Sequence, residues 1–194
     1  MPIRHKLAKI LFEASLLKRI ERTGYSYLGT GKENVASHSF GVVFATYLLC
    51  KIIPQKVDEL KALKMAILHD FVEARTGDFN AVNKLYNQAE EIRALQDAFS
   101  SLPFGEEVFI LFNEYRKNET LEAKIVHDAD TLDLIVQLKE QKDLNNPFAE
   151  RWINYAKRRL QLKETKELVE ALLETEWCSW WLERLLKERD EKGS

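Results

Sequence analysis

The chain has 194 residues, of which 45% are hydrophobic and 31% charged, and 29 Lys and Arg against 31 Asp and Glu give a formal net charge of −2. This length suits one domain with a single core. The nearly balanced charge argues against a surface for a nucleic acid polymer. Seven Gly and four Pro leave few residues for hairpins, which favours helices.

The cysteines and the apolar segments indicate the cellular compartment of the protein and whether a membrane is a partner. Cys50 and Cys178 match no zinc spacing, and they predict free thiols in a reducing compartment, which we take to be the cytoplasm. Glu13 interrupts the N-terminal stretch, which therefore does not predict a secretory signal. The apolar run from Phe40 to Cys50 is shorter than the ~18 residues of a membrane span, so no membrane partner is expected.

Apolar residues recur at helical spacing along the chain, and no segment shows the alternation of a strand. The sequence therefore predicts an all-α fold of about seven or eight helices in one domain, residues 1–194. A helix at about 164–189 should pack on the core or at a subunit interface. In chain order, the expected helices cover about 4–21, 33–53, 56–75, 84–101, 106–115, 120–145, a segment opened by Pro147, and 164–189.

Polar residues interrupt the apolar third helix at His69-Asp70, and Glu73 follows one turn later. Neighbouring residues of a regular helix point about 100° apart. His69 and Asp70 can therefore share one ion only where the helix packs tightly on the site or is distorted near its end, which Gly77 permits. The alternative is that Asp70 caps the helix or pairs with an arginine.

Two further residues in apolar helices complete a ligand set. A lone His38 would be typical of a satisfied core histidine, whereas Asp130, between Ala129 and Leu132, should point inward. His38, His69, Asp70 and Asp130 together offer two imidazoles and two carboxylates, which suit a divalent ion such as Mn²⁺, Co²⁺, Fe²⁺ or Zn²⁺.

Glu73 and His127 each allow two interpretations. Glu73 is placed to receive a proton from an attacking water, or else it is a solvated helix carboxylate. His127 shares a helix face with Asp130, so it is a candidate for a supporting contact or a competing ligand. Asp128 and Asp133 are predicted to lie on the solvated flank.

Several segments occur in an order that resembles the HD-domain metal-dependent phosphohydrolases, in particular the bacterial 5′-deoxynucleotidase-like branch. The resemblance covers roughly residues 10–160. The segments are Arg22-Thr23-Gly24-Tyr25, Asn34-Val35-Ala36-Ser37-His38-Ser39, His69-Asp70-Phe71-Val72-Glu73, Thr76-Gly77-Asp78, Glu122-Ala123 and Asp128-Ala129-Asp130-Thr131-Leu132.

The resemblance implies an HD-domain helical bundle around one divalent metal ion. Mn or Co is expected, with Fe, Zn, Ni or Mg as alternatives. The implied metal ligands are His38, His69, Asp70 and Asp130.

The resemblance also assigns roles around the metal. Glu73 would position or activate the attacking water, and Arg22 would grip the 5′-phosphate. Tyr25, where the family often has Trp, would pack against the sugar. Asp78 would contact the sugar and disfavour a 2′-hydroxyl, and Lys84 would lie near the phosphate.

Ser37 stands where the family often has Glu, a departure that bears on affinity and substrate preference more than on metal binding. The loop after Asp78 also lacks the prolines common in the family.

The expected function is hydrolysis of deoxyribonucleoside 5′-monophosphates by a cytoplasmic homodimer whose partner is a small nucleotide. One alternative is a nucleotide pyrophosphohydrolase or another small-phosphoester hydrolase. The other is a non-catalytic helical module that binds metal or nucleotide. Trp177, Trp180 and Trp181 are expected in the core or at a subunit interface rather than in base stacking.

Overall fold

The structure is a computed structural model that describes residues 2–192. The described residues form helices and one isolated β-bridge, between Glu21 and Asn34. The all-α prediction is therefore confirmed. The elements are α1 (Ile3–Leu16), η1 (Leu17–Arg19), α2 (Tyr25–Leu28), α3 (Val35–Ile52), α4 (Glu59–Leu68), α5 (Glu73–Thr76), α6 (Asn83–Tyr86), α7 (Glu91–Phe99), α8 (Gly105–Lys117), α9 (Leu121–Asp143), α10 (Ala149–Lys157), α11 (Lys163–Glu174) and α12 (Ser179–Lys192).

The predicted count of seven or eight helices was too low, because three expected helices are interrupted. The segment 56–75 contains α4 and α5, the segment 84–101 contains α6 and α7, and the segment 164–189 contains α11 and α12. Residues Asn87 and Thr175 are extended at two of these breaks, so their carbonyl groups leave the helical ladder. In addition, α2 is a single turn between the first two expected helices.

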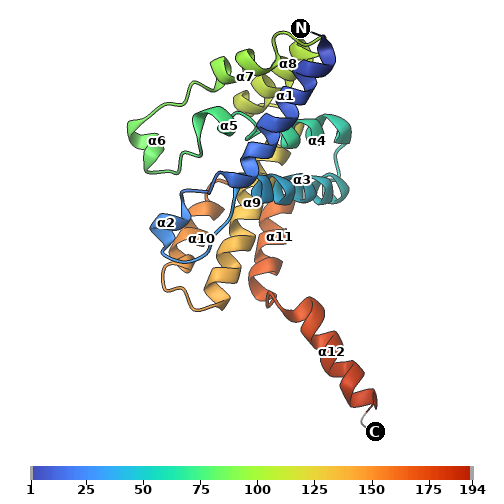
Figure 1. Ribbon diagram of the computed structural model, residues 1–194. Coiled ribbons are helices and arrows are strands. Elements are labelled where there is room, and N and C mark those ends of the chain that lie inside the picture. Colours follow the sequence, from blue (N-terminus) through green and yellow to red (C-terminus); the bar gives the residue numbers. More distant parts are fainter. Residues whose placement is uncertain (1, 193–194) are drawn as a thin grey trace.

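Helix α9 lies at the centre of the fold (Figure 1), with α10 on one side, α11 on the other and α3 crossing it. The main core is formed where α3 and α4 pack on α9, and it contains fully buried side chains such as Leu49, Met65 and Ile135. A second apolar cluster around Phe99 and Phe112 joins α7 and α8 to the turn before α5. The helices that pack on α9 place the predicted metal ligands close together.

Side-chain caps determine where the helices around the site begin. Asn34 accepts a hydrogen bond from the backbone N–H of Ser37 at 2.9 Å, which starts α3 just before His38. Thr120 accepts one from the backbone N–H of Ala123 at 3.3 Å and starts α9. Such caps satisfy N–H groups that have no partner inside the helix.

Helix α3 is apolar on both of its faces. Its 18 residues have a mean hydropathy of 1.4 and are long and apolar enough to cross a membrane, although 33% of that window is buried inside the fold. Val42 and Leu49 are on the face that enters the core, together with His38. Phe40 and Phe44 lie on the opposite, exposed face.

Candidate metal centre and substrate pocket

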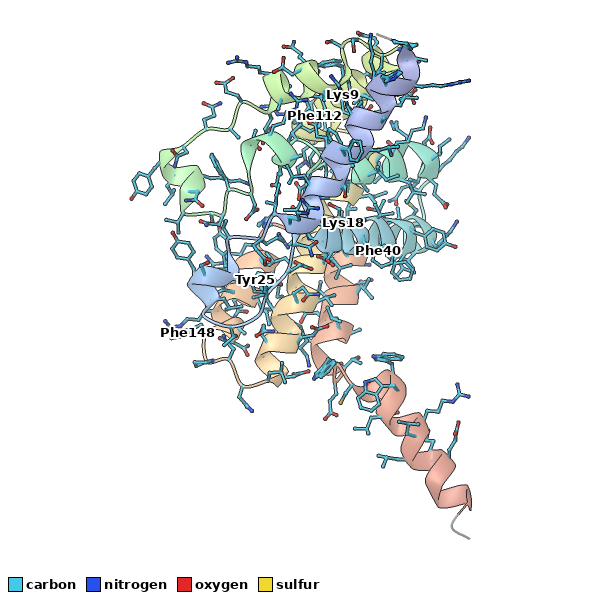
Figure 2. The ribbon with its side chains drawn as sticks, viewed as in Figure 1. Lys9, Lys18, Tyr25, Phe40, Phe112 and Phe148 are labelled. Atoms are coloured by element: carbon cyan, nitrogen blue, oxygen red, sulfur yellow. The ribbon has the colours of Figure 1, made fainter. Side chains whose placement is uncertain are left out.

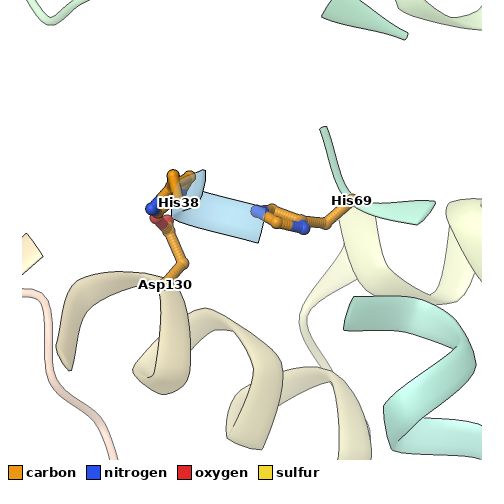
Figure 3. A group of neighbouring side chains, drawn as sticks. All are labelled: His38, His69 and Asp130. Carbon is orange, nitrogen blue, oxygen red and sulfur yellow. The ribbon is translucent and has the colours of Figure 1, made fainter. Parts of the chain in front are cut away.

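The structure brings the four predicted metal ligands together from α3, α9 and the end of α4. Ligand atoms of His38, His69 and Asp130 lie within 4.8 Å of one another (Figure 3). Oδ2 of Asp70 lies 3.5 Å from Nε2 of His38 and 3.2 Å from Nε2 of His69. Oδ1 of Asp130 lies 3.3 Å from Nε2 of His38.

The end of α4 explains how two neighbouring residues reach one point. Helix α4 ends at Leu68, and the chain continues in a tighter turn. In this turn the backbone N–H of Phe71 bonds the carbonyl of Leu68 at 3.1 Å, and that of Glu73 bonds Asp70 at 3.0 Å. Hydrogen bonds between residues three apart give fewer residues per turn than an α-helix has. The distortion expected near the end of this helix is therefore present.

Both histidine rings are oriented through Nδ1. Nδ1 of His69 donates to the carbonyl of Ala66 at 2.7 Å, and Nδ1 of His38 lies 2.7 Å from Oδ2 of Asp133. Nε2 of His69 is buried without a hydrogen-bond partner among the described residues. Bonds of this kind leave the Nε2 lone pairs for a cation. Buried nitrogen lone pairs beside two carboxylates fit a divalent metal ion.

The electrostatics of the cluster favour positive charge at its centre. Burial and the charge of Arg22 lower the pKa of His38, but Asp130, Asp133 and Asp70 outweigh them and raise it to about 10. Burial raises the pKa of Asp70, yet the neighbouring His69 and His38 lower it to about 2. The carboxylates thus stay ionised, as metal binding requires, whereas His38 must release its proton before its Nε2 can bind a metal ion.

The prediction that Asp128 and Asp133 are solvated was wrong, since both are buried. Asp128 accepts the backbone N–H groups of Gln161 and Leu162 at 2.8 and 2.9 Å, and so fixes the start of α11. Asp133 contacts His38 across the interface of α3 and α9. Hydrogen bonds offset the cost of burying these carboxylates.

Gly41 makes the contact between Asp133 and His38 sterically possible. A Cβ atom on Gly41 would overlap Oδ1 of Asp133 and lie 2.6 Å from its Cγ. Sequence reasoning missed both residues. The available signal was that Gly41 and Asp133 each lie three residues after a proposed ligand, on the same helix face.

Arg22 lies at the edge of the cluster and is held by ion pairing. Its Nη1 is 3.1 Å from Oε2 of Glu33 and 2.9 Å from Nδ1 of His38. Glu33 also accepts from the Tyr25 hydroxyl at 3.4 Å. Burial lowers the pKa of Arg22, but Asp130, Glu33 and Asp70 raise it well above its ordinary value. The guanidinium is therefore a fixed cation. Glu33, which orients it, was not singled out from the sequence.

Glu73 begins α5, and its Oε2 atom is buried without a hydrogen-bond partner among the described residues. Burial raises the pKa of Glu73, and the charges of Asp70 and Asp78 raise it further, to about 9. A divalent cation beside Asp70 would oppose this effect. Glu73 thus has the environment of a proton acceptor whose pKa depends on a neighbouring cation.

The predicted substrate residues line one cavity of about 750 Å³. This volume is within the range of small-molecule sites. Oδ2 of Asp78 accepts from the backbone N–H and the hydroxyl of Thr23, at 2.5 and 2.7 Å, and so joins two distant loops of the wall. The predicted residues on the cavity wall are Arg22, Tyr25, His69, Asp70, Glu73, Asp78, Lys84 and Asp130.

Helices α8 and α10 add residues to this cavity that sequence reasoning missed. Arg151 and Tyr155 of α10 and Arg159, just after its end, follow at four-residue spacing and line the wall together with Arg116 of α8. Nη2 of Arg159 donates to Oδ2 of Asp130 at 3.0 Å. The four-residue spacing was the one signal in the sequence. The cavity is therefore more basic than predicted.

His127 lies on the cavity wall but outside the ligand cluster. Its ring stacks on Tyr115 with centroids 4.2 Å apart, and its Nε2 lies 2.9 Å from the Tyr115 carbonyl. Burial lowers the pKa of His127. His127 is therefore a neutral ring whose Nε2–H donates to the Tyr115 carbonyl, and this contact stabilises the cavity wall.

An all-α fold with a His/Asp cluster assembled from separate helices is the architecture of an HD domain. The HD domain family matches residues 14–172. The chain therefore belongs to the HD domain family, whose members bind divalent metal ions.

Similar proteins agree with this assignment. A 5′-deoxynucleotidase of Dictyostelium discoideum is 31% identical over 135 residues, 64% of this chain and 71% of that protein. One from Schizosaccharomyces pombe is 30% identical, over 72% of this chain and 83% of that protein. A structure of a conserved hypothetical protein from Pyrococcus furiosus is 33% identical with a TM-score of 0.74, covering 87% of this chain and 99% of that one.

Proposed function

We propose that this protein is a metal-dependent phosphomonoesterase that hydrolyses deoxyribonucleoside 5′-monophosphates to nucleoside and phosphate. The observation that carries the proposal is that Arg22 and Glu73 open onto the same cavity as the ligand cluster. A fixed cation and a buried carboxylate beside a metal site are the groups that hydrolysis of a phosphate ester needs. The relatives named 5′-deoxynucleotidases support the choice of substrate.

His38, His69, Asp70 and Asp130 would hold one divalent ion, Mn or Co, with Fe, Zn, Ni or Mg as alternatives. When bound, such an ion polarises the phosphate and lowers the pKa of water. The mixed donors, two buried imidazoles and two partly buried carboxylates, support this choice of metals.

Arg22 binds the 5′-phosphate and neutralises charge that develops as the bond to the 5′-oxygen breaks. Its ion pair with Glu33 supports this role, because it fixes the guanidinium before substrate arrives. A guanidinium that is already oriented loses less conformational entropy on binding.

Glu73 accepts the proton of the attacking water. The unpartnered, buried Oε2 atom supports this role, because its lone pairs are free for such a water. A cation in the cluster lowers the pKa of Glu73 toward neutrality, where the deprotonated form is available.

Tyr25, Asp78 and Lys84 complete the substrate contacts. Tyr25 packs against the sugar, and Lys84, exposed on α6 at the cavity wall, approaches the phosphate. Asp78 contacts the sugar and disfavours a 2′-hydroxyl. With Oδ2 bound to Thr23, its Oδ1 atom is left for a sugar hydroxyl.

We place the protein in the cytoplasm as a homodimer of single-domain chains. Cys50 and Cys178 are both free thiols in the structure, which supports a reducing compartment.

A nucleotide pyrophosphohydrolase is the second candidate. It is favoured by the three additional arginines of the cavity, Arg116, Arg151 and Arg159, which could bind more than one phosphate group.

The test is phosphate release from a panel of ribo- and deoxyribonucleoside mono-, di- and triphosphates, with protein stripped of metal and reloaded with Mn²⁺ or Co²⁺. Metal-dependent release that is faster with deoxy monophosphates supports the function and the role of Asp78. Equal rates for both sugars would remove that role. Pyrophosphate or nucleoside monophosphate as the product would favour the second candidate. Tight metal binding without turnover would indicate a non-catalytic module.

A further inference from the structure

Helix α12 extends away from the rest of the fold (Figure 1), and the main helix–helix contacts of the domain do not include it. A helix of 14 residues is only marginally stable in water without tertiary contacts. The match to the HD domain family ends at residue 172, before α12 begins. The family core therefore does not explain this helix.

The apolar side chains of α12 form a surface that nothing in the described chain covers. We call this set the α12 stripe, and its members are between 36% and 53% exposed. Monomeric proteins rarely leave so many large apolar groups together in water. The α12 stripe consists of Trp181, Leu182, Leu185 and Leu186, which the helical spacing places on one side of α12.

A second exposed apolar surface lies on α3, on the side away from α9. We call it the α3 outer face, and its members are between 41% and 73% exposed. Figure 2 shows Phe40 at the outside of the fold. The spacing of four, three, one and four residues keeps the set on one side of the helix. The α3 outer face consists of Phe40, Phe44, Tyr47, Leu48 and Ile52.

We infer that α12 of one protomer docks on the α3 outer face of a second copy of this chain, and that the reciprocal contact closes a two-fold dimer. This inference gives an interface to the homodimer proposed above and is independent of the catalytic assignment. A two-fold interface uses the same pair of surfaces on both subunits.

The sizes of the two surfaces fit a stable dimer. At about 200 Å² for a large side chain, the α12 stripe and the α3 outer face together expose on the order of 1,000 Å² per protomer. A standard interface buries about 800 Å² per partner. Along the helix axes, at 1.5 Å per residue, the α12 stripe is about 8 Å long and fits within the α3 outer face, which is about 18 Å long.

The charges beside the α3 outer face do not oppose docking. Lys51 lies among its apolar residues, but its Nζ atom is 2.6 Å from Oε2 of Glu59 and 4.9 Å from the centre of the Tyr47 ring. A paired lysine costs less to cover than an isolated charge.

A second copy is favoured over the chain's own domain by the direction of α12. Helix α11 packs against α3 and α9, and α12 leaves from the end of α11 and points away from its own α3 (Figure 1). Thr175, which ends α11, is extended, so the chain passes outward at this point.

The experiment measures the molar mass of the full chain by sedimentation velocity. Leu185→Glu changes the α12 stripe, Phe44→Glu changes the α3 outer face, and Ile110→Glu is the control at an exposed apolar position of α8. We expect a dimer for the unchanged protein and the control. Each of the other two variants should raise the dimer dissociation constant at least about 10-fold.

Mixing the two variants gives the decisive result. The Phe44→Glu chain keeps its α12 stripe and the Leu185→Glu chain keeps its α3 outer face, so a mixture should recover a dimer held by one intact contact. Failure to recover it would overturn the inference, because pairing of like surfaces would not be restored by mixing.

The other possible results also test the docking of α12 on a second copy. A monomeric unchanged protein overturns the inference, and its tryptophan emission then shows whether α12 covers its own domain. Binding of the monomer to vesicles of phosphatidylcholine and phosphatidylserine would identify a membrane as the occupant. Circular dichroism checks that the variants are folded. Phosphate release by the variants tests the proposed function separately, because both changed surfaces lie outside the cavity.

Discussion

Oδ2 of Asp133 lies 2.7 Å from Nδ1 of His38, so a carboxylate of α9 orients an imidazole of α3. The bond fixes the ring so that Nε2 faces Asp70 and Asp130, at 3.5 and 3.3 Å. Hydrogen bonds that orient a metal ligand commonly contribute 10–100-fold to metal affinity.

Asp133→Asn should therefore weaken Mn²⁺ binding by about 10–100-fold, because an amide neither carries the charge nor accepts as strongly. Equilibrium dialysis of the stripped protein measures the affinity. Asp97→Asn, at an exposed position of α7, is the matched control and should leave it unchanged. Equal affinity in Asp133→Asn and the unchanged protein would contradict the assigned role.

Gly41→Ala should lower both metal affinity and stability. The added Cβ would displace Asp133 from His38 in a packed interface, and overpacking of this kind costs about 1–3 kcal/mol. Urea unfolding of the metal-free protein measures the stability. Gly24→Ala is the control, since its Cβ would meet Trp152 at an ordinary 3.9 Å. Unchanged stability of Gly41→Ala would show that α3 and α9 can move apart without cost.

Glu73→Gln should keep the metal and lose turnover by about 10²–10⁴-fold, because glutamine cannot accept a proton. The loss should be in kcat, measured as phosphate release at saturating substrate and Mn²⁺. Asp70→Asn should instead lose the metal. If both variants lose metal to the same extent, the separation between a ligand and a proton acceptor is wrong.

Glu73 also predicts how stability depends on pH when metal is absent. Burial, Asp70 and Asp78 raise the pKa of Glu73 from 4.5 to about 9. The folded protein then keeps a proton that the unfolded chain releases, so this residue makes the free energy of unfolding fall as pH rises from about 4.5 to 9.

Glu73→Gln removes this dependence. The free energy of unfolding of the variant minus that of the unchanged protein should therefore increase by at least about 1 kcal/mol from pH 6 to pH 8.5. A full pKa unit corresponds to about 1.4 kcal/mol. Urea unfolding with a chelator present measures both proteins. If the stability of both proteins depends on pH in the same way, Glu73 is ionised in the metal-free fold and the prediction is wrong.

The helical fold could be predicted because apolar periodicity is a local property of the sequence. The break after Leu68 was less visible, since the tighter turn there depends on how the second apolar cluster packs around Phe71. The break at Thr175 was missed because Glu and Leu continue the helical pattern on both sides of it. Helix number was therefore underestimated while helix positions were largely right.

The candidate site was predictable where chemistry is concentrated in short segments. His69, Asp70 and Glu73 lie within one turn of each other, and their combination is unusual in an apolar helix. Asp133 and Glu33 were missed because their roles come from contacts with His38 and Arg22 across separate elements. The spacing places Asp133 on the helix face of Asp130, but no spacing within a single helix identifies its partner on another element.

Helix α9 carries three carboxylates with separate tasks within six residues. Asp128 holds the start of α11, Asp130 belongs to the candidate ligand cluster, and Asp133 orients His38. Inserting or deleting one residue in this stretch would rotate everything beyond it by about 100°. Natural variants of this segment should therefore differ in residue type but not in length, whereas the loop between α9 and α10 can change in both.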